Sequence, residues 1–68
     1  MSIARITEIK ASSPVSFDDA IKTGLARASK TLDNVRSAWI SSQEVLLNGK
    51  GNITEYRVLM KVTFILKD

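Results

Sequence analysis

The side chains that most often carry enzymatic chemistry are scarce in this chain of 68 residues. Histidine and cysteine are absent, which removes the commonest general base, the commonest metal ligand and every thiolate nucleophile. Serine hydroxyls remain, but they lack an activating histidine or an obvious lysine base, so acyl transfer has no starting point. The nucleophiles excluded on this ground are Ser12, Ser13, Ser16, Ser41 and Ser42. We therefore predict that the protein is not an enzyme.

Acidic residues give a weaker hint of a metal site. Asp18 and Asp19 could be read as calcium ligands, but calcium takes about six to eight oxygen ligands. Two acids at the start of a helix are explained by the positive end of the helix dipole. A symmetric assembly could still gather copies of one carboxylate around an axis and so build a cation site. The acids that could do this are Glu8, Glu44 and Glu55.

Residues 48–51, Asn-Gly-Lys-Gly, could suggest a phosphate-binding loop. They lack the strand–loop–helix context and the spacing of such loops. Asn and Gly tolerate positive φ and are typical of hairpin turns. We therefore predict a plain turn over residues 48–52.

Charge and hydropathy exclude several classes of partner. The net charge is only +3 and the basic residues are scattered, which argues against nucleic-acid binding. No apolar run approaches the roughly 18 residues that suggest a membrane span. Residues 1–12 alternate between apolar and polar, so no secretory signal is expected. The absence of cysteine fits a reducing compartment, and we expect a cytoplasmic protein.

Hydrophobic spacing predicts a first strand and a helix. Residues 3–10 alternate as in a half-buried strand, and the Ser-Ser-Pro segment at 12–14 should end it. Ser16 can cap a helix over residues 17–32. We expect Gly24 in that helix to allow a close contact with the sheet. The apolar stripe of the helix recurs at three- and four-residue spacing and consists of Phe17, Ala20, Ile21, Gly24, Leu25, Ala28 and Leu32.

Two longer strands are expected over residues 35–47 and 53–66. The last strand has an almost purely apolar face, formed by Val58, Met60, Val62, Phe64 and Leu66. We expect the C-terminal part of this face to pack on Ile21, Leu25 and Ala28 of the helix. Simple alternation places six residues on one face of the preceding strand. They are Ser37, Trp39, Ser41, Gln43, Val45 and Leu47.

These elements predict an α+β fold of order β-α-β-β, with a three-stranded antiparallel sheet wrapped on one helix. The chain is expected to form a single domain, residues 1–68. The sheet face that the helix leaves uncovered would expose Leu59 and Ile65, and such apolar patches mark interfaces. A domain of this size buries only about 60 % of the surface of its unfolded chain and commonly needs a partner subunit. We therefore predict self-association.

Two stretches of the chain resemble the dodecin family. Residues 12–35, SSPVSFDDAIKTGLARASKTLDNV, are similar to the family's T/S-S-x-x-S-[WF] turn, its acid-started helix ending near RA-x-x-T-[LV], and the following N-[VL]. Residues 55–68, EYRVLMKVTFILKD, look like the family ending Y-Q-x-x-x-[KQ]-V-x-F-x-L. Gln43 fits a family glutamine six residues beyond the flavin-stacking position. The resemblance covers nearly the whole chain.

This resemblance implies twelve subunits that form a hollow, homododecameric shell of cubic symmetry. It also implies that flavins such as riboflavin or FMN, or related compounds, bind in pairs near the axes between subunits. Such proteins store or quench flavins and do not convert them. Because some dodecin-like proteins are described as calcium-binding, a calcium-binding shell is a second hypothesis. A structural oligomer without a small ligand is a third.

The sequence departs from the family at both flavin-recognition positions. The stacking tryptophan that follows N-[VL]-x is Ser37 here, and the glutamine that follows the tyrosine of the last strand is Arg57. Serine offers no aromatic surface, and arginine has donors but no acceptor. We therefore expect weakened flavin stacking. Arg57 would suit an anionic partner such as a phosphate-bearing cofactor.

Trp39 lies two residues after Ser37, so the two side chains should leave the same face of the strand. Trp39 could line a neighbouring part of the ligand pocket, or it could fill an interface between subunits. The candidate ligand-binding residues are therefore Ser37, Trp39, Gln43 and Arg57.

Overall fold

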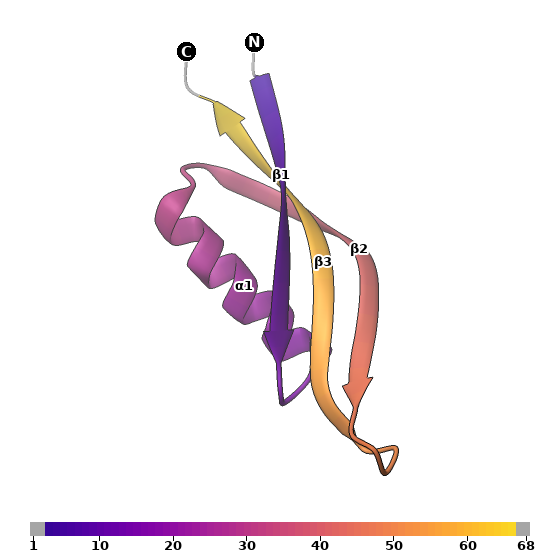
Figure 1. Cartoon of the computed structure of the whole chain (residues 1–68). Coiled ribbons are helices and arrows are strands. Elements are labelled where there is room, and N and C mark those ends of the chain that lie inside the picture. Colours follow the sequence, from indigo (N-terminus) through magenta and orange to yellow (C-terminus); the bar gives the residue numbers. More distant parts are fainter. Residues whose placement is uncertain (1–2, 67–68) are drawn as a thin grey trace.

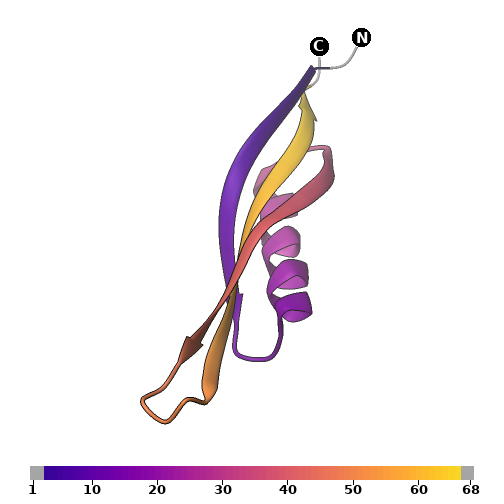
Figure 2. The ribbon, with the colours of Figure 1, turned by 90° about the vertical axis from the view of Figure 1, so that its right-hand side faces the viewer.

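The computed structural model describes residues 3–66 and has the predicted β-α-β-β order (Figure 1). The elements are β1 (Ile3–Ser13), α1 (Phe17–Thr31), β2 (Val35–Leu47) and β3 (Ile53–Leu66). The sheet order is β1-β3-β2, and both pairings with the central strand β3 are antiparallel. Helix α1 covers one face of the sheet (Figure 2). The predicted α+β class and three-stranded antiparallel sheet are confirmed.

Strand β1 is longer than predicted. Ser12 pairs with Arg57 and Ser13 with Tyr56, so the prediction that the two serines end the strand is wrong. The pairing stops at Pro14, since proline has no N–H to donate to a ladder.

The start of α1 is fixed by two serines and an aspartate. The Ser16 Oγ accepts a hydrogen bond from the Asp19 N–H at 2.9 Å, which is the predicted cap. The buried Ser13 hydroxyl donates to the Asp19 carboxylate at 2.6 Å. The pair Asp18 and Asp19 therefore starts the helix, as predicted, and Asp19 is already engaged within the chain.

The core is small and is centred on the middle of β3. Val58, Met60 and Val62 are at most 1 % exposed and pack with Ala20 of the helix. Val62 lies in the core with Ile21 and Leu25 packed against it, as predicted. Phe64 is only half-buried and Leu66 is 38 % exposed, so the prediction that these two residues also form the core is wrong. The end of β3 extends past the last turn of α1, which therefore cannot cover it (Figures 1 and 2).

The sheet surface turned away from α1 is called the open face below, and the covered surface the helix face. Directly opposed residues of neighbouring strands share a face. The ladder therefore places the odd-numbered β3 residues from 55 to 65 on the open face with their partners on β1 and β2. The apolar side chains among them include Leu59 and Ile65, as predicted.

Gly24 lies where the helix approaches the sheet most closely. A Cβ placed on Gly24 would lie 2.8 Å from the Ala11 Cβ and 2.9 Å from the Met60 Cε. Real Cβ atoms essentially never come this close to other heavy atoms. The predicted close contact between helix and sheet at Gly24 is therefore confirmed.

We predict that Gly24→Ala destabilises the protein, although alanine is favoured over glycine by about 1 kcal/mol in a helix interior. Overpacking costs typically about 1–3 kcal/mol, and the Ala11 side has no flexible end that could move away. Chemical denaturation measures the change. Gly49→Ala is the matched control, because nothing lies within 4 Å of its added Cβ. A Gly24→Ala protein that is more stable than wild type would show that the contact is looser than described.

Candidate functional site

The pairing of β2 with β3 has three irregularities, and two of them, at Ser41 and Thr54, decide where the site residues point; the third is at Arg36, near the start of β2. Ser41 is an extra residue in β2, between the pairs Ile40–Met60 and Ser42–Leu59. Its hydroxyl donates to the backbone oxygen of Leu59 at 3.1 Å. Each bulge places two residues of one strand against one residue of the other.

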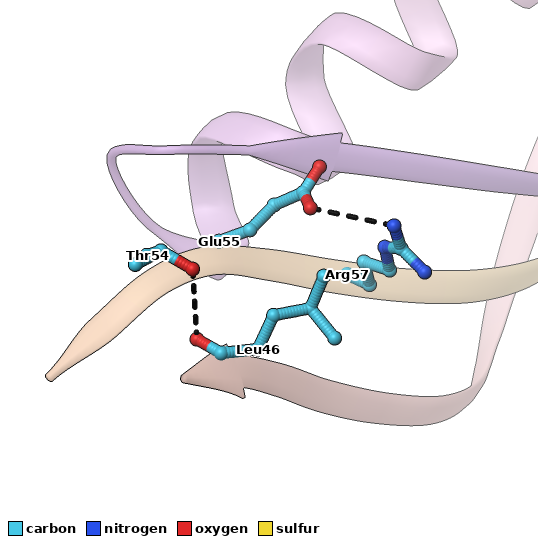
Figure 3. A network of polar contacts seen from close by, with 4 residues as sticks. All are labelled: Leu46, Thr54, Glu55 and Arg57. Atoms are coloured by element: carbon cyan, nitrogen blue, oxygen red, sulfur yellow. Dashed lines mark hydrogen bonds and ion pairs between the residues drawn. The ribbon is translucent and has the colours of Figure 1, made fainter. Parts of the chain in front are cut away.

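The second bulge lies near the hairpin turn and is on the other strand. Thr54 is an extra residue in β3, between the pairs Leu46–Glu55 and Leu47–Ile53. Its hydroxyl donates to the backbone oxygen of Leu46 at 3.2 Å (Figure 3). Both bulged residues therefore hold the opposite strand through a side-chain hydroxyl.

Between the two bulges the pairing is shifted by one residue, which exchanges the faces of β2. Gln43 lies opposite the buried Val58, on the helix face, whereas Glu44 lies opposite Arg57 on the open face. Simple alternation placed Gln43 with Ser37 and Trp39, and that prediction is wrong. The reason is that a shift of one residue moves every following side chain to the other face. Val45 and Leu47 move with Gln43.

Ser37 and Trp39 do share the open face, and each faces a polar residue of β3. Ser37 pairs with Thr63, and Trp39 pairs with Lys61. The Trp39 side chain is 66 % exposed, and the Lys61 Nζ lies 5.3 Å from the centroid of its ring. We call the four residues Ser37, Trp39, Lys61 and Thr63 the Trp39 patch. It combines an exposed indole, an ammonium group and two hydroxyls.

Sequence reasoning did not single out Lys61 and Thr63 as site residues. Counting back from the turn at residues 48–52 predicts the pairing of Lys61 and Thr63 with β2. The extra residues Ser41 and Thr54 lie on opposite strands, so their one-residue shifts cancel for residues 37–40. Nothing in the side-chain pattern, however, marks them apart from other residues of the mixed strand face.

Arg57 lies on the open face but belongs to a different group of residues. It is four residues from Lys61, which is about 13 Å along a strand. Its guanidinium forms an ion pair with Glu55 at 3.4 Å (Figure 3) and it pairs across the ladder with Glu44. We call these three residues the Arg57 cluster. Arg57 therefore faces two carboxylates, which weakens the prediction that it receives an anionic ligand.

The turn at residues 48–52 uses its own amides. The Asn48 side-chain oxygen accepts hydrogen bonds from the N–H groups of Lys50 at 2.8 Å and Asn52 at 3.1 Å. Gly51 has a φ of +83°, which glycine adopts without strain. The predicted plain turn is confirmed, since amides bonded within the loop are not directed at a phosphate.

A groove of about 350 Å³ runs between β1 and α1. It contains none of the four candidate ligand-binding residues and no aromatic side chain, so it offers no stacking surface. The lining residues are Thr7, Glu8, Ile9, Lys10, Gly24, Arg27, Ala28, Thr31 and Leu32. We therefore take the Trp39 patch, and not this groove, as the candidate ligand site.

Two properties of residues 3–66 bear on metal binding and membrane insertion. Within that range, one copy of the chain has no group of three or more acidic, histidine or cysteine side chains placed to hold a metal ion. The single helix of this part of the chain is not long and apolar enough to cross a membrane.

Comparison with known proteins indicates one family. The family model described as Dodecin matches residues 3–67. The calcium dodecin of Mycobacterium tuberculosis is 30 % identical over 67 residues, which cover 98 % of this chain and 93 % of that protein. The solved dodecin of Streptomyces davaonensis is 37 % identical and superposes with a TM-score of 0.92, covering 98 % of this chain and 97 % of that one. The solved structure of the Mycobacterium tuberculosis calcium dodecin has a TM-score of 0.83 at 27 % identity, with 97 % and 93 % of the two chains covered.

The shifted register predicts which engineered cysteines can form a disulfide. Opposed residues of antiparallel strands lie about 4.5–5.5 Å apart at Cα, which suits a disulfide. We expect Glu44→Cys with Arg57→Cys to form an intramolecular disulfide, since these residues pair. Gln43→Cys with Arg57→Cys should not, because the two side chains leave opposite faces.

The natural chain has no cysteine, so mass spectrometry of the oxidised, denatured proteins reads each pair without background. Cross-linking of the Gln43 pair in preference to the Glu44 pair would mean that the strand continues past Ser41 without a bulge.

Proposed function

The chain belongs to the dodecin family, and on this premise we propose that it is a non-catalytic subunit of a homododecameric shell that binds a small planar ligand. The observation that carries the assembly is the excess surface of a single copy. Its accessible surface is 5013 Å², whereas a compact monomer of 7.5 kDa is expected to expose about 4,200 Å². Its radius of gyration is 14.1 Å, against about 11 Å for a compact domain of this length.

Two surfaces of the single copy carry exposed apolar side chains that partner copies would cover. On the open face, Ile6 is 62 % and Trp39 66 % exposed. At the end of the β2–β3 hairpin, which projects beyond α1 (Figure 2), Leu47 is 57 % and Ile53 48 % exposed. Burying apolar surface is the main driving force of association. Both surfaces are therefore proposed contacts between copies.

The proposed ligand site is the Trp39 patch, placed where open faces of neighbouring copies approach one another. Among residues 3–66, Trp39 is the aromatic side chain of the open face. Tyr56 lies on the helix face, where its ring makes an edge-to-face contact with that of Phe17 at 5.1 Å between centroids. Phe64 also lies on the helix face. An exposed indole favours planar aromatic ligands by stacking. Flavins such as riboflavin and FMN are the proposed class. The indole that would stack lies two residues from the family's stacking position, which is Ser37.

A calcium-binding shell is the second candidate, favoured by the similarity to calcium dodecin. The charges of a single copy give it less support. Glu55 is held by Arg57 at 3.4 Å, Glu44 also lies opposite Arg57, and Glu8 lies opposite Lys61. A calcium ion would have to compete with these basic groups or bind carboxylates gathered from several copies.

The proposal assigns no reaction to the protein. The sequence lacks histidine and cysteine. Three serine hydroxyls already form hydrogen bonds within the chain: those of Ser13 and Ser16 at the helix start and that of Ser41 at the bulge. The absence of cysteine also fits a reducing compartment, and we propose the cytoplasm as its location.

We predict that the purified protein has the native mass of twelve chains by light scattering. Leu59→Glu, at the centre of the open face, should dissociate the assembly, because an unpaired charge in an interface costs several kcal/mol. Lys22→Glu, on the exposed surface of α1, introduces the same carboxylate away from the open face and should leave the mass unchanged. A monomeric wild-type protein at micromolar concentration would refute the proposed shell.

We predict that riboflavin binding depends on Trp39. Stacking on an aromatic side chain is worth about 1–3 kcal/mol per ring in nucleic-acid systems, so Trp39→Ala should weaken binding by roughly 5- to 150-fold. Trp39→Phe keeps an aromatic ring and should retain part of the affinity. Gln43→Ala, on the helix face, should change little.

Quenching of flavin fluorescence measures the riboflavin affinity of the wild type and of the three variants. Tight wild-type binding that survives Trp39→Ala would rule out stacking on this residue. Absence of riboflavin binding together with a higher melting temperature in calcium would favour the cation-binding shell.

A further inference from the structure

Lys61 is the basic residue that accompanies the exposed indole. Its Nζ lies 5.3 Å from the centroid of the Trp39 ring, within the range of about 6 Å in which a cation is attracted to an aromatic face. Over residues 3–66, no carboxylate oxygen lies within 4.0 Å of this ammonium. The guanidinium of Arg57, by contrast, already forms an ion pair with Glu55. Lys61 is thus the better placed of the two cations to meet a new anion.

The surroundings of Lys61 supply further groups that favour an anion. Ser37 and Thr63 are opposed to each other on the same face, one residue pair along the ladder from Trp39 and Lys61. Their hydroxyls can donate hydrogen bonds to phosphate or carboxylate oxygens. Glu8 lies opposite Lys61 on the β1 side and is the acidic residue that faces it. The patch is therefore positive toward β2, where Trp39 stands, and is bounded by a negative charge toward β1.

We propose that Lys61 anchors the anionic group of a ligand whose planar ring stacks on Trp39, so that the site selects phosphate-bearing aromatic ligands over neutral ones. This inference rests on the proposed ligand site and adds the chemical class and the residue that reads it. A ring lying on the indole comes within reach of an ammonium that is already 5.3 Å from the indole centroid. A neutral side group on the ligand gains nothing from that charge.

The anchor proposed from the sequence, Arg57, is replaced in this role for two reasons. It lies about 13 Å along the strand from Lys61, and Leu59 separates the two on the same face. It is also bonded to Glu55 and opposed by Glu44. A phosphate at Arg57 would therefore meet two carboxylates, whereas a phosphate at Lys61 meets only Glu8 across the ladder.

Titration of the intact assembly with riboflavin and FMN tests the anchor, because the two ligands share one ring system and differ by a phosphate. We expect the wild type to bind FMN about 5-fold more tightly than riboflavin, the upper range for an exposed ion pair. The preference should shrink at high ionic strength, where such pairs are screened.

Three variants separate the anchor from the stacking surface. Lys61→Met keeps an unbranched side chain without its charge and should bind FMN and riboflavin equally. Glu8→Gln should increase the preference for FMN, because it removes the one carboxylate that faces Lys61. Lys22→Met, on the exposed surface of α1, makes the same charge change elsewhere and should leave the preference as in wild type.

The outcomes distinguish this inference from the proposed function. Equal wild-type affinity for both flavins, or a preference for FMN that persists in Lys61→Met and is unmoved in Glu8→Gln, overturns the anchor while leaving stacking on Trp39 in place. Failure of both ligands to bind the wild-type assembly overturns the ligand site itself, and the anchor with it.

Discussion

The length of the helix relative to the sheet is the constraint on which the rest of this structure depends. Helix α1 has 15 residues and is about 22 Å long, whereas β3 has 14 residues and spans about 46 Å. The helix therefore covers roughly half of one face of the central strand. The buried core is confined to that half, at Val58, Met60 and Val62. At Gly24, where an added Cβ would clash, the helix comes close to Ala11 and Met60 of the sheet.

The uncovered surface follows directly from this mismatch. The hairpin end projects past the helix on one side (Figure 1), and the open face has no second layer. In a chain without cysteine, the proposed assembly would supply this further layer from other copies, since small cores give little stability. This is the physical reason why association and ligand binding are proposed on the same surface. A ligand that stacks on an exposed indole and is enclosed by a neighbouring copy loses more contact with water than one bound to a single copy.

The two bulges divide the open face into regions of different chemistry. Ser41 and Thr54 each add one residue to opposite strands, so the segment between them is shifted relative to residues 37–40. That shift brings Glu44 beside Arg57 and sends Gln43 to the helix face. The charges of the Arg57 cluster thereby largely offset one another, whereas Lys61 of the Trp39 patch has no ion pair among residues 3–66. An anion is for this reason better suited than a cation to the part of the open face that carries the indole.

The order, type and approximate bounds of the elements could be predicted from the amino-acid sequence, because the hydrophobic period, the Ser16 cap and the Asn48–Asn52 turn are local signals. The family could also be identified from the sequence, through motifs spread over the whole chain. The sequence further shows that Ser37 stands at the family's stacking position and that Trp39 follows two residues later. It could not determine which face each β2 residue occupies beyond Ser41. A bulge is selected by hydrogen bonds to the opposite strand, such as that from Ser41 to the Leu59 carbonyl, and these do not exist until the strands have paired. Only the paired strands therefore show that Gln43 lies on the helix face, whereas the pairing of Lys61 with Trp39 already follows from the turn at residues 48–52.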